Sequence, residues 1–266
     1  MKRIGDVIRN IPIRPPSSTA TGEIVISSRD IVRCPICQDA GWLRGDFPVG
    51  HPLFGQLFPC ECKQREQSER RRDELSRLSN LEKYGELSFD NFDPHVDGVS
   101  EAYEAALQFA QEPGSHWLFL SGPTGTGKTH LAVAAAKYAL EHHNMSVYVA
   151  AVPDLLDHLR ASFDPRAGTG YDDLFGMIKG AQLLVLDDLG TENATPWAQE
   201  KLYQVVNHRY MEQMPTVITS NVDLKKIDDR VASRIQDHRL SRYVQVDAED
   251  YRRPGHIRQI RRPSRR

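Results

Sequence analysis

Residues 116–142 have the sequence HWLFLSGPTGTGKTHLAVAAAKYALEH, and this stretch decides the fold. Gly122 to Thr129 match the pattern G-x-x-x-x-G-K-[S/T], with an apolar run before them and an amphipathic run after them. Glycines at these positions let backbone N–H groups turn inward around phosphates at a helix N-terminus. We therefore predict a phosphate-binding loop between a strand at 116–120 and the helix that follows.

The loop contains the candidate ligands for a nucleotide and its metal ion. The ammonium of Lys128 would reach the β- and γ-phosphates, and the hydroxyl of Thr129 would bind Mg²⁺. The predicted nucleotide-binding residues of this segment are Gly122, Pro123, Thr124, Gly125, Thr126, Gly127, Lys128, Thr129 and His130.

The pattern of short apolar runs extends along the rest of the chain. The runs occur at 116–120, 146–150, 182–186, 216–220 and 242–246. Helical patterns such as THLAVAAAKYALEHH and PWAQEKLYQVVNHRYMEQ lie between them. Nearly continuous apolar strands alternating with helices predict an α/β fold whose parallel sheet is covered on both faces.

Two carboxylates follow the apolar run LLVL at 183–186. Ligands of α/β proteins bind at the carboxyl ends of the strands, so Asp187 is predicted to hold Mg²⁺ and Asp188 to polarise an attacking water. An acid that only caps the next turn is the alternative, and the phosphate loop upstream disfavours it.

Another polar group follows the run at 216–218, where the sequence continues Thr219-Ser220-Asn221. Asn221 would orient the water near the γ-phosphate if it lay beside the loop. An Asx turn that only shapes the backbone explains the same residue equally well.

All four cysteines lie in one segment, with the spacing Cys34-x2-Cys37-x22-Cys60-x-Cys62. Two close pairs separated by an excursion predict a tetrahedral Cys₄ site for Zn²⁺, with a structural role because no coordination position stays open. His51 lies between the pairs and could replace one thiolate, but four cysteines are the favoured set.

Neither a secretory signal nor a membrane span is evident. The N-terminal MKRIGDVIRNIPIRPP is basic without an apolar h-region, and no apolar run approaches the roughly 20 residues of a membrane helix. We expect a cytoplasmic protein, in which disulfides between the cysteines are disfavoured.

The charged residues are unevenly distributed along the chain. The 34 Lys and Arg residues nearly balance the 36 Asp and Glu residues, but residues 252–266 hold seven arginines and no acid. Such a tail suits an anionic partner such as nucleic acid, and a disordered solubilising tail explains it equally well. The predicted organisation is an irregular arm at 1–30, a zinc module at 31–64, a linker helix at 65–85, an ATPase domain at 86–253 and a basic tail at 254–266.

The glycine loop, the apolar run ending in two aspartates and the strand followed by TSN resemble an AAA+ ATPase. The segments SFDNFDP, LLVLDDLGTENATPWAQEKLYQVVNHRY, TVITSNVDL, DDRVASRI and AEDYRR resemble the bacterial replicative helicase loaders of the DnaC/DnaI type and the related IstB transposition helper ATPases. The resemblance covers residues 86–253 and implies binding and hydrolysis of ATP with Mg²⁺.

The resemblance also implies roles for single residues. Asn221 matches sensor 1, Arg252 matches sensor 2, and Arg230 and Arg234 fall in the segment that carries the arginine finger, for which we favour Arg234. An ion pair of Arg234 with Asp228 or Asp237 is the purely structural alternative. Phe89 and Phe92 lie where the family's entry segment approaches the adenine. Only about 20 residues follow the run at 242–246, too few for a full helical lid, which weakens the assignment of Arg252.

The expected function is that of a helicase loader that binds a replicative helicase and single-stranded DNA and self-associates through its ATPase domain. Residues 153–180 would form two helices around a Gly-rich loop, with Arg160, Arg166 and Lys179 as sequence-neutral DNA contacts. A solvated helix pair is nearly as good an account of that region. An IstB-like transposition helper is the alternative function, and the cysteine module disfavours it. A small-molecule kinase is a further alternative, but it would leave the segments TSN (219–221) and VASR (231–234) without a role.

Overall fold

The computed structural model describes residues 32–164, 170–192 and 195–250. The chain divides into two compact units, residues 1–70 and 71–266. The predicted N-terminal arm, the basic tail, Arg166 and Arg252 lie outside the described residues.

The first unit contains a small antiparallel ladder between β1 (Trp42–Arg44) and β2 (Leu57–Pro59). Helix α1 (Glu61–Leu78) starts inside the cysteine segment, four residues before the predicted linker helix. It ends at Leu78, and the 3₁₀ helix η2 (Asn80–Tyr84) continues the chain. Leu81 and Tyr84 lie three residues apart within η2, which is one turn of a 3₁₀ helix, and the single predicted helix is therefore two elements.

A five-stranded parallel sheet forms the centre of the second unit, which confirms the predicted α/β fold. Its strands are β3 (Trp117–Ser121), β4 (Val147–Ala151), β5 (Leu183–Leu189), β6 (Thr216–Ser220) and β7 (Ser241–Gln245). The strand order is β4-β5-β6-β3-β7, with every pairing parallel. The strand that precedes the phosphate loop, β3, therefore has β6 and β7 as its neighbours.

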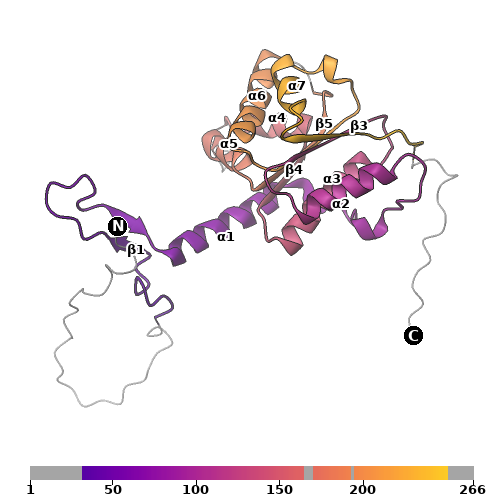
Figure 1. Cartoon of the computed structure of the whole chain (residues 1–266). Helices are drawn as coiled ribbons and strands as arrows, with labels where there is room; N and C mark the ends of the chain where they lie inside the picture. Colours follow the sequence, from indigo (N-terminus) through magenta and orange to yellow (C-terminus); the bar gives the residue numbers. More distant parts are fainter. Residues whose placement is uncertain (1–31, 165–169, 193–194, 251–266) are drawn as a thin grey trace, which may run out of the picture. The chain divides into compact units, whose positions relative to one another are not determined.

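Helices cover both faces of this sheet (Figure 1). One face packs against α2 (Ser100–Gln111) and α3 (Lys128–His142). The other packs against α4 (Val152–Ala161), α5 (Tyr171–Lys179), α6 (Pro196–Met211) and α7 (Asp229–Ile235). Alternation along β5 divides the core, since Leu183 and Val185 join the first face while Leu184 and Leu186 join the second. None of the described helices is long and apolar enough to cross a membrane.

One edge of the sheet, at β4, is closed by a side chain. The hydroxyl of Ser79 accepts a hydrogen bond of 3.0 Å from the backbone N–H of Val149. Ser79 is buried, and η2 packs beside β4. A backbone donor that would otherwise face outward from this edge strand is thereby satisfied.

A fully buried arginine, Arg209 of α6, ties together the amino ends of the strands. Its Nε donates to the hydroxyl of Thr216 at 2.8 Å, and Nη1 donates to the carbonyls of Lys179 and Ala181 at 3.0 and 2.8 Å. Nη2 donates to the carbonyl of Pro215. Burial lowers the pKa of Arg209 to about 9.

Replacing Arg209 with methionine is expected to destabilise the second unit by about 3 kcal/mol, because buried carbonyls would lose their donors. Arg209→Lys should recover only part of the loss, since an ammonium cannot reproduce the planar fork. Chemical denaturation of the full chain measures both effects. A loss below about 1 kcal/mol for the methionine variant would contradict this account of the core.

Candidate nucleotide-binding and zinc sites

The phosphate loop has the backbone conformation that its glycines permit. Gly122, Gly125 and Gly127 have φ values of 151°, 86° and 89°, a region that other residues seldom adopt. A β-carbon at Gly122 would lie 2.1 Å from the carbonyl oxygen of Val246, and one at Gly125 would lie 2.0 Å from a carboxylate oxygen of Asp250. Val246 and Asp250 thus lie close against the loop, and the loop leads directly into the N-terminus of α3.

The Lys128 ammonium lies within the loop. Its Nζ donates to the carbonyls of Gly122 and Pro123 at 2.8 and 2.6 Å, and the side chain is buried. The hydroxyl of Thr126 also donates to the Pro123 carbonyl, at 3.0 Å. The positive charge is therefore held at the helix N-terminus, where phosphate oxygens bind.

The carboxylate of Asp187 lies directly beside the loop. One of its oxygens, Oδ1, accepts hydrogen bonds from the hydroxyls of Thr129 and Thr219, at 2.9 and 2.6 Å. Burial raises the pKa of Asp187 above its ordinary value, against the effect of the Thr219 hydroxyl, which lowers it. A carboxylate and a threonine hydroxyl are hard oxygen ligands, so this pair fits Mg²⁺. The sequence had predicted Thr129 and Asp187 as its ligands.

Asp188 has an unusual backbone. Strand β5 continues to Leu189, beyond the expected end at residue 186, and its pairing with β6 shifts register between Leu186 and Leu189. Asp188 has φ of +55°, which aspartate tolerates better than most residues, and its N–H donates to the hydroxyl of Thr219 at 2.9 Å. At this bulge Asp187 is buried and Asp188 is half-exposed.

Because the sheet is parallel and β6 lies between β5 and β3, the carboxyl ends of β5 and β6 lie at the same end of the sheet as the phosphate loop. Asn221, half-exposed, directly follows the last residue of β6. Thr219 is the residue that sequence reasoning missed, because its hydroxyl joins both aspartates only once β5 and β6 are neighbours. The signal available was a threonine near the carboxyl end of a buried strand.

The side chain of His130 contacts the entry segment. Its Nε2 lies 2.8 Å from the Ser88 carbonyl oxygen and 3.0 Å from Oδ1 of Asn91. Its ring packs edge-on against Phe92 at 5.0 Å, and burial lowers its pKa. Phe92 is also so close to Gly127 that a β-carbon there would lie 2.8 Å from the phenyl ring. The segment around Phe89 and Phe92 thus lies against the loop.

The candidate finger arginines lie on α7, which packs against α6. Arg230 pairs with Asp228, and Asp237 pairs with Arg239, so the suggested ion pair of Arg234 with either acid is wrong. Arg234 contacts α6 through Asn207 and Tyr203 instead.

The four cysteines meet in the first unit. Their sulfur atoms all lie within 4.8 Å of one another, with 3.7 Å between Cys34 and Cys60 and 3.3 Å between Cys37 and Cys62. Four thiolates around one Zn²⁺ lie roughly 3.8 Å apart, so the cluster is compatible with this ion. The backbone N–H groups of Cys37 and Ile36 lower the pKa of Cys34 to about 7, which favours its thiolate.

Purified, reduced protein is expected to carry about one zinc per chain, and Cys60→Ser should lose it, because zinc ligands act as a set. Metal analysis checks the stoichiometry, and circular dichroism of the full chain reports the loss of order. His51→Ala is the matched control and should retain the metal. A zinc-free preparation of wild type under reducing conditions would refute the site.

The parallel sheet, the glycine loop and the adjoining aspartate define a P-loop NTPase with the fold of the AAA+ class. A model of the IstB-like ATP-binding proteins matches residues 53–256, and the chain belongs to that family.

Several relatives share part of the chain. The replicative helicase loader DnaC of Buchnera aphidicola from Acyrthosiphon pisum is 27% identical over 61% of this chain and 67% of its own length. DnaC of Escherichia coli K12 is 28% identical over 56% of this chain and 61% of its own. The matched segment thus spans about two thirds of these loaders.

Solved structures share the fold. The crystal structure of the DnaC helicase loader superimposes with a TM-score of 0.55 at 23% identity, over 62% of this chain and 99% of that chain. The crystal structure of DnaI gives 0.51 at 27% identity, over 62% of this chain and 90% of that chain.

Proposed function

We propose that this protein is an ATP-dependent loader of a replicative helicase that binds single-stranded DNA and uses ATP hydrolysis as a switch. The observation that carries the ATP part is the contact of Thr129 and Thr219 with Asp187 beside the lysine of the loop. The relatives described as replicative helicase loaders support the choice of partner.

Each group at the strand ends has a task in this proposal. Lys128 and the loop backbone bind the β- and γ-phosphates, and Thr129 and Asp187 hold Mg²⁺. When bound, the ion supplies positive charge against the phosphate oxygens. Asp188 polarises the attacking water and Asn221 orients it. Arg252, outside the described residues, is the sensor-2 candidate.

The surface of the zinc module supports a docking role. Seven of the ten large apolar side chains that are exposed in the described chain lie there. They are Val32, Ile36, Trp42, Val49, Phe54, Leu57 and Phe58. Apolar exposure concentrated in so short a segment is typical of a protein interface. We assign this surface to the helicase.

The surface around α4 and α5 supports binding of single-stranded DNA. Phe163, 54% exposed, stacks on Tyr171 with 4.4 Å between ring centres, and Tyr171 stacks on Phe175 at 5.5 Å. Lys179 lies 4.6 Å from the centre of the Phe175 ring, and Arg160, which pairs with Asp157, lies 5.1 Å from that of Trp197. Stacked aromatic rings flanked by cations suit unpaired bases and their phosphates.

Phe163→Ala is expected to weaken binding of single-stranded DNA about 5- to 150-fold, the contribution of one base stacked on an aromatic ring. Fluorescence anisotropy with labelled oligothymidine at two salt concentrations measures the loss. Met211→Ala removes another exposed apolar side chain, on α6, and should change nothing. Equal affinities for Phe163→Ala and wild type would remove this surface from the proposal.

The loader function is tested with purified components. The full chain is mixed with the replicative helicase of the same organism, or with a transposase, in the presence of ATP or ADP, and complexes are separated by size. A nucleotide-dependent complex with the helicase, weakened by Trp42→Ala, supports the proposal. A complex with the transposase alone favours the second candidate, a transposition helper of the IstB-like family.

A further inference from the structure

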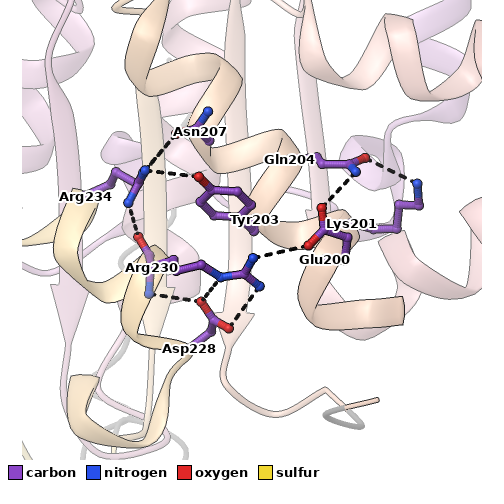
Figure 2. Close-up of polar contacts among 8 residues, drawn as sticks. All are labelled: Glu200, Lys201, Tyr203, Gln204, Asn207, Asp228, Arg230 and Arg234. Carbon is purple, nitrogen blue, oxygen red and sulfur yellow. Dashed lines mark hydrogen bonds and ion pairs between the residues drawn. The ribbon is translucent and has the colours of Figure 1, made fainter. Parts of the chain in front are cut away.

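The two arginines of α7 are one helical turn apart and have opposite surroundings (Figure 2). Arg230 is paired with two carboxylates, with 3.2 Å from Nε to Oδ1 of Asp228 and 3.2 Å from Nη1 to Oε2 of Glu200. Its guanidinium also lies over the ring of Tyr203, 4.3 Å from the centre. The charge of Arg230 is therefore offset within its own subunit.

Arg234 is held by neutral oxygen atoms. Its Nε and Nη2 both donate to Oδ1 of Asn207, at 3.0 and 2.9 Å, and Nη2 also donates to the hydroxyl of Tyr203 at 3.2 Å (Figure 2). Nη1 donates to the backbone carbonyl of Arg230 at 2.8 Å. Among the described residues no carboxylate forms an ion pair with Arg234. The guanidinium is thus fixed in direction by neutral acceptors, without a carboxylate partner among the described residues.

One face of α6 supplies these contacts. Tyr203, Asn207 and Tyr210 are spaced by four and three residues, so they lie along one side of the helix. The guanidinium of Arg234 lies 5.0 Å from the ring centre of Tyr203 and 5.9 Å from that of Tyr210. An aspartate at position 207 could make the same hydrogen bonds but would cancel the charge, whereas asparagine only orients it.

We propose that Asn207 and Tyr203 are positioning residues for Arg234, which they hold ready for the γ-phosphate bound by a neighbouring subunit. This inference rests on the proposed ATPase function. A flexible arginine loses much rotamer freedom when it engages a phosphate, and fixing it beforehand removes that cost from the reaction step. Four of the five N–H groups are used in fixing the side chain, which leaves one Nη1–H without an acceptor among the described residues.

The decisive variant is Asn207→Asp. It preserves shape and hydrogen bonds but gives Arg234 a carboxylate, so we expect kcat to fall about 10- to 100-fold with unchanged ATP affinity and no decrease in Tm. Asn207→Leu should also lower kcat, because the guanidinium loses its acceptor. Tyr203→Phe removes one hydroxyl only and should lower kcat about threefold; it keeps the test available if the leucine variant does not fold.

Mixing shows on which side of the interface the defect lies. Asn207→Asp subunits keep an intact phosphate site, so adding Lys128→Ala subunits, which keep a correctly positioned Arg234, should restore part of the hydrolysis. Gln204→Leu is the matched control, since Gln204 on the same helix bonds to Glu200 and Lys201 and does not touch Arg234 (Figure 2). Its kcat should stay that of wild type.

Two results would overturn the inference and are distinguishable. If Asn207→Asp and Tyr203→Phe fold, bind ATP and hydrolyse it at the wild-type rate while Arg234→Ala does not, the positioning role fails and the proposed ATPase function stands. If Arg234→Ala itself hydrolyses ATP normally, the arginine finger fails together with its positioning residues.

Discussion

Lys128→Ala is expected to abolish tight binding of ATP, with a loss of affinity of about 100-fold or more. The buried ammonium is the cation inside the loop, and each hydrogen bond it makes to a charged phosphate oxygen is worth about 1.5–3 kcal/mol. Alanine is a strong helix former, so the start of α3 should persist. Equilibrium titration with a fluorescent ATP analogue measures the affinity.

The fold of the Lys128 variant needs its own check, because the carbonyls of Gly122 and Pro123 lose a donor. Circular dichroism and a melting curve without nucleotide should resemble those of wild type. Lys137→Ala is the matched control, since the Lys137 ammonium on the same helix donates to the Gly85 carbonyl and not to the loop, and this variant should bind ATP normally. Undiminished affinity in a folded Lys128→Ala protein would rule out the phosphate loop as the nucleotide site.

Arg234→Ala is expected to reduce hydrolysis by roughly 10³–10⁵ while ATP affinity changes little. Charge that develops on the γ-phosphate needs a guanidinium, and α7 provides that of Arg234, which has no carboxylate partner in the part of the chain that the structure describes. Arg230→Ala is the internal comparison, since the charge of Arg230 is already offset by Asp228 and Glu200, and its effect should be far smaller. The rate of single-turnover hydrolysis with saturating ATP measures the effect of each variant.

Mixed assemblies test whether Arg234 acts between subunits. Arg234→Ala keeps its phosphate site and Lys128→Ala keeps its arginine, so some activity should return when the two inactive proteins are combined. Native mass spectrometry shows whether mixed assemblies form. If mixed assemblies form and no activity returns, action in trans is excluded. If Arg230→Ala lowers hydrolysis more than Arg234→Ala does, Arg230 is the arginine finger.

The parts of the site that could be predicted are those encoded by neighbours in the chain. The glycines, Lys128 and Thr129 act within one turn between a strand and a helix, and Asp187 directly follows an apolar run, so spacing alone places them. The contact of Thr219 with both aspartates depends on β5 lying beside β6, which the sequence does not state.

Contacts between segments that are distant in the sequence also explain the other differences between the predicted and the observed site. The bulge at Asp188 arises from the register between two strands, and the expected end of β5 was three residues too early. His130 belongs to the loop in sequence, but its side chain contacts Ser88, about 40 residues upstream. The side-chain acceptors of Arg234 lie on α6, whereas the structural alternative drawn from the sequence paired it with Asp228 or Asp237.

The contact of Ser79 with Val149 has a consequence for how copies of this chain associate. An open edge of a sheet accepts strands from other molecules without discrimination, because backbone donors and acceptors are the same in every chain. At β4 the Ser79 hydroxyl takes the place of a carbonyl from another strand, and η2 lies alongside. The pairing of a further strand with this edge of the sheet is therefore blocked. Association in the proposed assembly then depends on side chains such as those of α6 and α7, which differ between proteins and distinguish a proper neighbour from an accidental one.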